Sequence, residues 1–213
     1  MPHVHLPTDE QIEAALRPYG FGPTAAFCEK TRSYMSLLLK WNQRVALTSV
    51  TSISEILRVH FGESLFGISV ANTMDGRLAD VGSGAGFPGA PLAMALSHLE
   101  VDLIESNAKK AAFLAELVRM LQLENLQVRH ERTESVPAGE TFDIVTARAV
   151  GEYAQLLDWC EARLNARGRV VLWLGVGQIA KIERLDGWIW QKPCRVPRTK
   201  GRFVLVGSLR GSV

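Results

Sequence analysis

The sequence has few cysteines, no long apolar run and no large excess of charge of either sign. Its three cysteines, Cys28, Cys160 and Cys194, form no CxxC pair, so we expect neither a disulfide framework nor a structural zinc site. No stretch approaches the roughly 20 uninterrupted apolar residues of a membrane span. The first residues lack the basic stretch and apolar run of a secretory signal. At 213 residues and 47% hydrophobic, the chain is expected to be a globular protein of the cytoplasm with no membrane contact.

The net charge of +2 hides an uneven distribution. Residues 1–75 carry a net charge of −1, residues 76–159 carry −5 and residues 160–213 carry +8. The last third contains five basic residues with no acid between them, Lys192, Arg195, Arg198, Lys200 and Arg202. Such a surface attracts phosphates by Coulomb forces and counterion release, so these residues are candidates for binding RNA. A solvated basic surface without a partner is the alternative.

Hydrophobic periodicity divides the chain near residue 76. Capping patterns at Thr8 and Ser52 and apolar residues at helical spacing predict an all-helical extension over residues 1–75. Residues 76–213 alternate between short apolar runs and helical stretches, which predicts a doubly wound parallel sheet. We expect strands over residues 78–81, 101–104, 126–130, 142–147, 169–174, 188–196 and 202–208. The last two are joined by a short loop and must be antiparallel.

A glycine-rich loop, DVGSGAGFPG over residues 80–89, follows the first strand and opens a helix. It is not a dinucleotide fingerprint, because Phe87 stands where GxGxxG needs its last glycine, and it has no GK[ST] of a Walker loop. An acid two residues before GxGxG is typical of the S-adenosylmethionine (SAM) site of Rossmann-like methyltransferases. Asp80, Gly82, Gly84 and Gly86 are therefore candidate SAM-binding residues. A tight turn without a ligand is the alternative.

Three further positions follow the next strands of the predicted sheet. Glu105 ends the second strand, where a carboxylate can accept hydrogen bonds from ribose hydroxyls; a helix N-terminal acid is the alternative. Thr133 and Glu134 follow the third strand and are expected beside adenine. Arg148 leaves the fourth strand at the switch point of the sheet, where it is a candidate to meet a carboxylate, a phosphate or a base.

The sequence lacks the signatures of several methyl acceptors. It has Ala147-Arg148-Ala149-Val150 where amine methyltransferases commonly have [DN]PP[YFW]. Methylation of a pyrimidine carbon needs a cysteine nucleophile, and we interpret Cys194 as structural. A ring nitrogen such as guanine N7 needs only positioning, because it has its own lone pair. The five histidines show no metal-ligand spacing, so no metal is expected, and His60 is interpreted as a packing residue.

The chain resembles the GidB (RsmG) family in Lys40-Trp41-Asn42, Leu47-Thr48, His60-x-x-Glu63-Ser64-Leu65, the loop over residues 80–89, Arg132-Thr133-Glu134 and Arg148-Ala149. These bacterial enzymes methylate guanine N7 in the 530 loop of 16S ribosomal RNA. The resemblance implies a Rossmann-like methyltransferase with a seven-stranded, mostly parallel sheet whose last strand is antiparallel. It implies SAM as cofactor and 16S rRNA or the small ribosomal subunit as partner. The sequence itself gives no oligomeric state, and a monomer is the default expectation. The resemblance places Gly82, Phe87, Thr133, Glu134 and Arg148 at the cofactor, with Arg148 also the catalytic candidate.

The sequence departs from the family pattern at three positions. Ala46 replaces an asparagine, Glu63 replaces an aspartate, and Leu174 replaces a lysine that is expected on the catalytic face. These departures leave two alternatives. One is a SAM-dependent methyltransferase for a small molecule or another RNA, and the other is a non-catalytic rRNA-binding assembly factor.

Overall fold

The computed structural model describes residues 5–72, 74–149 and 151–211. In its described residues, the N-terminal part has helices as its regular elements, namely α1 (Asp9–Leu16), η1 (Arg17–Tyr19), α2 (Ala25–Asn42), α3 (Ile53–Glu55), the π-helix η2 (Ile56–Gly62) and α4 (Glu63–Ala71). The predicted capping box at Thr8 is present, because its side chain accepts from the N–H of Gln11 and the Gln11 side chain accepts in return. None of the described helices is long and apolar enough to cross a membrane.

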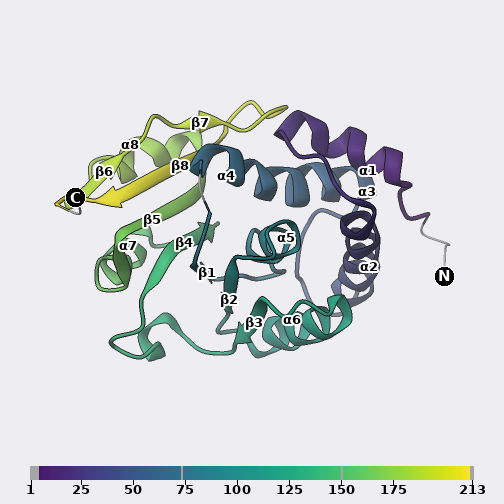
Figure 1. Ribbon diagram of the computed structural model, residues 1–213, viewed down its shortest axis with the longest axis horizontal. Coiled ribbons are helices and arrows are strands. Elements are labelled where there is room, and N and C mark those ends of the chain that lie inside the picture. Colours follow the sequence, from purple (N-terminus) through teal and green to yellow (C-terminus); the bar gives the residue numbers. More distant parts are fainter. Residues whose placement is uncertain (1–4, 73, 150, 212–213) are drawn as a thin grey trace.

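The second part is a sheet with helices on both faces (Figure 1). Its strands are β1 (Arg77–Val81), β2 (Glu100–Ile104), β3 (Leu126–Arg129), β4 (Phe142–Arg148), β5 (Leu164–Gly175), β6 (Trp188–Trp190), β7 (Cys194–Arg195) and β8 (Arg202–Leu209). Between them lie α5 (Gly89–Ala95), α6 (Ala108–Leu121), η3 (Thr133–Ser135), α7 (Tyr153–Glu161) and α8 (Val176–Ile182). The predicted Rossmann-like α/β class is confirmed.

The sheet has the order β3-β2-β1-β4-β5-β8-β6, with β7 also paired to β8. The strands β1 to β5 run parallel, and β8 runs antiparallel to β5, β6 and β7. The order reverses between β1 and β4, so the crevice at their carboxyl ends is the expected ligand site.

The prediction of seven strands is wrong by one, because the strand expected over residues 188–196 is two short strands. Both β6 and β7 pair with β8, and the residues between them include Pro193. Proline has no N–H to donate to a ladder, so it interrupts a strand that the apolar residues on either side favour. The described residues therefore form eight strands.

One hydrophobic cluster joins the N-terminal helices to the sheet. It contains Leu16 and Leu38 from the helices together with Leu103 and Val204 from the strands. A second cluster fills the other face of the sheet beneath α7 and α8. Figure 1 shows α7 and α8 on one side of the sheet and α2, α5 and α6 on the other. The division at residue 76 stays a prediction, but the two parts share a core.

Candidate functional site

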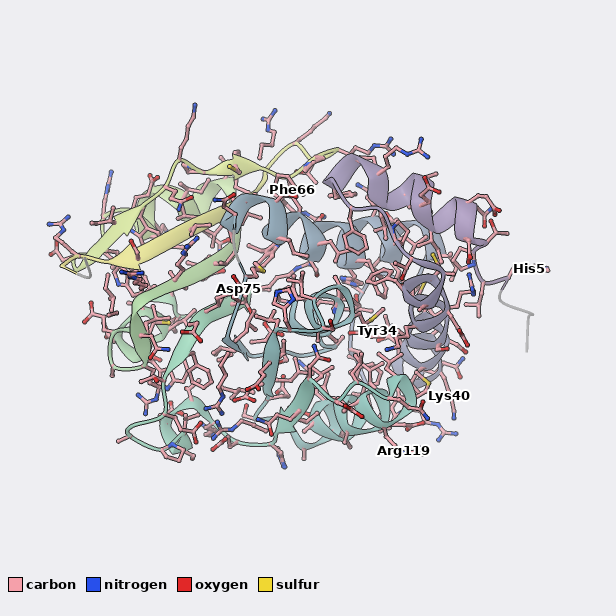
Figure 2. All side chains as sticks on the ribbon, in the orientation of Figure 1. His5, Tyr34, Lys40, Phe66, Asp75 and Arg119 are labelled. Carbon is pink, nitrogen blue, oxygen red and sulfur yellow. The ribbon has the colours of Figure 1, made fainter. Side chains whose placement is uncertain are left out.

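The glycine loop between β1 and α5 has a main chain that only glycine adopts readily. Gly82, Gly84 and Gly86 have φ angles of +69°, +57° and +88°. At Gly86 a Cβ would lie 2.5 Å from the Tyr34 hydroxyl, so a side chain there is excluded by space as well. The same hydroxyl donates a hydrogen bond to the Ala85 carbonyl at 2.5 Å. Helix α2, which carries Tyr34 (labelled in Figure 2), therefore fixes the loop from outside the sheet.

Asp80 stabilises the glycine loop through hydrogen bonds. Its Oδ2 accepts from the Gly89 N–H at 3.1 Å and its Oδ1 accepts from the Thr146 hydroxyl at 2.9 Å. The residue is 1% exposed, and burial raises the pKa of its carboxyl to about 6. Its contacts are thus with the loop and β4, and its predicted contact with SAM stays a prediction.

Glu105 is also held by main-chain groups. Its Oε2 accepts from the Gly84 N–H at 2.8 Å, and its Oε1 accepts from the Asn107 N–H at 2.7 Å. Each carboxylate oxygen has a second lone pair, so these bonds leave acceptor capacity. The predicted contact with a ribose is not tested by this geometry.

Two cavities meet at Gly82. The first, of about 220 Å³, lies at the carboxyl ends of β1 to β3 and is lined by Val81, Gly82, Ile104, Ser106, Glu131, Arg132, Thr133 and Glu134. The second, of about 210 Å³, is lined by Leu47, His60, Gly82, Ser83, Gly84, Ala85, Phe87, Lys110, Arg148 and Ala149. The two cavities therefore bring together Gly82, Gly84 and Phe87 of the glycine loop with Thr133, Glu134 and Arg148, whereas Asp80, Gly86 and Glu105 line neither of them.

The volumes of the cavities do not by themselves identify these two as the functional site. A cavity of about 510 Å³ lies at the amino ends of β2 and β3, between Ser97 and Gln127. It lies at the end of the sheet opposite the switch point. We assign the site to the smaller pair because parallel sheets bind ligands at the carboxyl ends of their strands.

His60 is a wall of the second cavity that the sequence analysis missed as a site residue. Its ring stacks on Phe87 at 4.5 Å between centroids, and Phe87 stacks on Tyr34 at 5.0 Å. Its Nε2 lies 2.7 Å from the Thr48 hydroxyl. Burial, aided by the positive charge of Arg148, lowers the pKa of His60 to about 3, so the ring is neutral at physiological pH. Lys110 and Leu47 of the same wall were also missed.

Arg148 ends β4 and has internal partners. Its Nη1 donates to the Val59 carbonyl at 2.9 Å, and its Nη2 lies 3.5 Å from Glu63 Oε2. The next residue, Ala149, has a φ of +57°, a strained conformation that clusters at functional sites. Arg148 is thus held at the switch point, as predicted from its place after the fourth strand.

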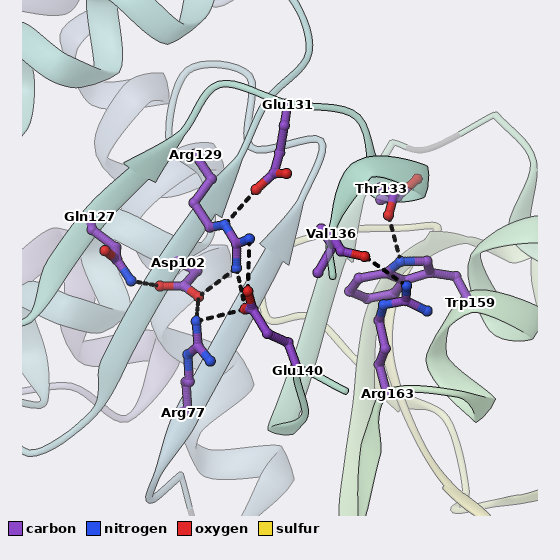
Figure 3. Close-up of polar contacts among 10 residues, drawn as sticks. All are labelled: Arg77, Asp102, Gln127, Arg129, Glu131, Thr133, Val136, Glu140, Trp159 and Arg163. Carbon is purple, nitrogen blue, oxygen red and sulfur yellow. Dashed lines mark hydrogen bonds and ion pairs between the residues drawn. The ribbon is translucent and has the colours of Figure 1, made fainter. Parts of the chain in front are cut away.

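The loop that carries Thr133 is fixed by a charged network on the face of β2 and β3 (Figure 3). Asp102, 1% exposed, pairs with Arg77 at 2.5 Å and with Arg129 at 3.5 Å. Arg129 Nε donates to Glu131 at 2.5 Å, and Glu131 lines the first cavity. On the other side of the loop, Trp159 Nε1 donates to the Thr133 carbonyl at 2.9 Å.

The candidate RNA-binding residues do not share one environment. Lys192, Arg195, Arg198 and Lys200 are exposed. Arg202 is exposed as well, with 45% of its side-chain surface accessible, but it also donates from Nη1 to both oxygens of Glu63, at 2.7 and 2.9 Å. Its contact with RNA stays a prediction, whereas its ion pair inside the protein is part of the structure.

Leu174 corrects an expectation about the catalytic face. It is 2% exposed and belongs to the cluster beneath α7 and α8. Arg148 is the register partner of Trp173, so the side chain of the next residue along β5 points to the opposite face. A lysine at position 174 would therefore start from the face away from Arg148. Its absence removes no cation from the cavity that Arg148 lines.

Among the residues that the structure describes, no three His, Cys, Asp or Glu side chains gather closely enough to hold a metal ion.

Solved structures share the fold. A SAM-dependent methyltransferase from Aquifex aeolicus superposes with a TM-score of 0.56 and 16% identity, covering 66% of this chain and 88% of that one. A mutant of MtNAS in complex with S-adenosylmethionine gives a TM-score of 0.59 and 17% identity, over 83% of this chain and 73% of that one. At these identities the likeness shows the fold alone.

Sequence comparisons show the family. A family model described as GidB, rRNA small subunit methyltransferase G, matches residues 27–190. Ribosomal RNA small subunit methyltransferase G of Roseiflexus sp. (strain RS-1) is 37% identical over 190 residues, covering 84% of this chain and 81% of the relative. The protein of that name from Xanthomonas axonopodis pv. citri (strain 306) is 35% identical over 190 residues, covering 88% and 89%. With the glycine loop and its two cavities in place, these matches show that the chain belongs to the GidB family of small-subunit ribosomal RNA methyltransferases G.

Proposed function

We propose that this protein transfers a methyl group from SAM to N7 of a guanine in the 530 loop of 16S rRNA. As a GidB family member, it is a SAM-dependent methyltransferase of small-subunit rRNA. The observation that carries the proposal is the pair of cavities that meet at Gly82, with Thr133 and Glu134 at one end and Arg148 at the other. The atom and the loop of the RNA rest on the family resemblance and on the chemistry of the site.

The residues of the two cavities fit SAM. A Cβ at Gly84 would meet only the Gly82 carbonyl, at 3.7 Å, so the missing side chain leaves open space at the cavity wall. Lys110 and Arg148 line the second cavity, where they can attract the carboxylate of the methionine part. Thr133 and Glu134 in the first cavity offer oxygens to the adenosine part. Charge and hydrogen-bonding groups thus match the two ends of the molecule.

Little acid–base chemistry is required of the protein. Bound SAM supplies a methyl group on a positively charged sulfur. Guanine N7 attacks with its own lone pair and loses no proton, so positioning is the main requirement. The neutral ring of His60 and the ring of Phe87 form a wall that excludes water. On the other side of this cavity, Gly82, Gly84 and Glu105 would bind SAM.

The exposed basic residues Lys192, Arg195, Arg198 and Lys200 would hold the phosphates of the RNA beside the site. We propose that the enzyme works in the cytoplasm as a monomer on the small subunit or its RNA.

The test is methyl transfer from radiolabelled SAM to small subunits taken from a bacterial strain that lacks this modification. The RNA is digested to nucleosides and the label identified, and an Arg148→Met variant serves as control. Label in 7-methylguanosine, mapped to the 530 loop and lost in the control, is the expected result.

Label in another nucleoside or another loop would contradict the proposed target. SAM and RNA binding without any transfer would favour a non-catalytic assembly factor. Transfer to a small molecule with no affinity for RNA would favour a different substrate.

A further inference from the structure

Glu63 is a buried carboxylate that joins two arginines from distant parts of the chain. It is 1% exposed and begins α4, in the N-terminal helical part. Its oxygens accept from Arg202 at 2.7 and 2.9 Å, and Oε2 lies 3.5 Å from Arg148. Arg148 lines the cavity beside the glycine loop, whereas Arg202 follows the exposed basic residues over 192–200.

The sheet brings these groups to one face. Arg148 is the register partner of Trp173, and Arg202 that of Gly175, so all project toward α4. Trp173 Nε1 donates to the Glu63 carbonyl at 2.6 Å, which fixes the main chain of Glu63 as well. The main chain of Glu63 is thus held by Trp173, and its carboxylate is held by Arg202 and lies beside Arg148.

The charges decide what this arrangement does. The proposed reaction moves one positive charge from the sulfur of SAM to the guanine ring within the cavity that Arg148 lines. Without Glu63, the charge of Arg148 in that cavity and that of Arg202 behind it would oppose both the donor and the methylated product. A buried carboxylate between them removes half of that positive charge without admitting water.

We propose that Glu63 is a positioning residue for methyl transfer, which fixes and partly neutralises Arg148 and holds Arg202 in the same ion-pair cluster. This inference rests on the proposed function and deepens it. It separates Arg202 from the basic residues before it in the sequence. Arg202 acts on the rate of transfer through Glu63, while Lys200 acts on RNA affinity.

The experiment measures kcat and KM for small subunits, together with the salt dependence of RNA binding. Glu63→Gln keeps the size and one acceptor but loses the charge, and we expect kcat to fall at least about tenfold with KM for RNA within about twofold. Glu63→Asp restores the charge and is expected to regain most of the rate. SAM affinity and the circular dichroism spectrum check that each variant folds.

Two further variants separate positioning from RNA contact. Lys200→Gln is expected to raise KM and to reduce the slope of log K against log salt by roughly 0.7–0.9, with kcat unchanged. Arg202→Met removes both hydrogen bonds that hold the Glu63 carboxylate in place beside Arg148. We expect this loss of positioning to outweigh the removal of one positive charge, so that kcat falls and the slope is unchanged. This variant also serves if Glu63→Gln does not fold.

The inference is overturned if Glu63→Gln retains the kcat of the parent, or if Arg202→Met reduces the salt slope as Lys200→Gln does. Absence of transfer by the unmodified protein would contradict the proposed function instead. In that case the salt slopes of the two basic variants still decide whether Arg202 contacts RNA.

Discussion

At the scale of single residues, Gly84 shows that a glycine can be required by the backbone conformation without being required by contacts within the protein. Its φ of +57° strains any other residue, but a Cβ would meet the protein only at 3.7 Å. We predict that Gly84→Ala costs about 1–2 kcal/mol of stability from backbone strain, and that it weakens SAM binding at least about tenfold because the methyl group enters the cavity. Calorimetric titration with SAM and denaturant unfolding measure the two effects.

Gly139→Ala is the matched control. Gly139 also has a positive φ and nothing within 4 Å of a Cβ, but it lies outside both cavities. It should lose at least as much stability, because its φ of +147° is even less accessible to alanine, and it should bind SAM normally. Equal SAM affinities for the two variants would show that the ligand does not approach Gly84.

His60 makes stability depend on pH in a predictable direction. Its pKa is lowered to about 3, so below its ordinary pKa of 6.5 the folded state binds fewer protons than the unfolded state. Stability from this residue is present above pH 6.5 and falls as the pH falls. We predict that His60→Gln removes about 2 kcal/mol of the change in unfolding free energy between about pH 7.5 and pH 5.

The measurement is urea unfolding of both proteins at the two pH values. Asp80 acts with the opposite sign, because its raised pKa of about 6 makes the folded state bind more protons in this range. The difference between His60→Gln and the parent therefore carries the prediction. An identical pH response would show that His60 ionises freely in the folded protein.

Whether a single residue of the site could be predicted depends on whether it follows a strand of the parallel sheet, and not on its distance along the chain from the glycine loop. Asp80, Gly82, Thr133 and Arg148 follow strands, and a parallel sheet brings strand ends together. His60 and Glu63 lie in a helical part whose packing against the sheet no local pattern specifies. The sequence motif around them was visible, but the ion pair of Glu63 with Arg148 and the place of His60 in the cavity that Arg148 lines were not.

At the scale of elements, α2 fixes the glycine loop through one hydroxyl. Tyr34 is fully buried and donates to the Ala85 carbonyl. Tyr34→Phe leaves that carbonyl unpaired, so we predict a loss of about 1–3 kcal/mol of stability and weaker SAM binding. Thermal unfolding with and without SAM measures both.

Tyr19→Phe is the control on the same helical part. The Tyr19 hydroxyl is buried with no hydrogen-bond partner among the described residues. Its removal should leave stability unchanged or raise it. If both variants behaved alike, the bond from Tyr34 would contribute nothing to the loop.

The elements themselves were mostly predictable, and the exceptions have local causes. Hydrophobic runs located β1 to β4 within a residue or two. The strand expected over 188–196 failed at Pro193, where the lack of an N–H outweighs the apolar pattern. β5 begins at Leu164, five residues earlier than expected, because Leu164 pairs with Phe142 of β4. The residues between Leu164 and the predicted strand include Arg167 and Gly168, which show no strand pattern.

At the scale of the whole molecule, charge is concentrated near β7. Replacing Lys192 and Lys200 by glutamine removes two exposed charges there. We predict that the slope of log K for RNA against log salt becomes shallower by roughly 1.4–1.8, with SAM affinity unchanged. Filter binding over a range of salt concentrations measures the slope.

The control removes two charges elsewhere, from Arg119 on α6 and Lys40 on α2, both exposed and both on the lower right in Figure 2. Figure 2 shows Arg119 on the lower side of the molecule, far from β7 at the top of Figure 1. Its slope should match the parent. Equal effects of the two double variants would indicate attraction by total charge rather than by this surface.

The position of β8 has a consequence for synthesis. β8 follows β6 and β7 in the chain but lies between β5 and β6 in the sheet. As the chain leaves the ribosome, β5 therefore keeps an open edge, and β6 has no neighbour, until residue 209 has emerged. The pair of Glu63 with Arg202, 139 residues apart, closes only then. A nascent chain stalled before residue 202 would hold the glycine loop but not the complete ion-pair cluster, so methyl transfer would begin only after β8 has been synthesised.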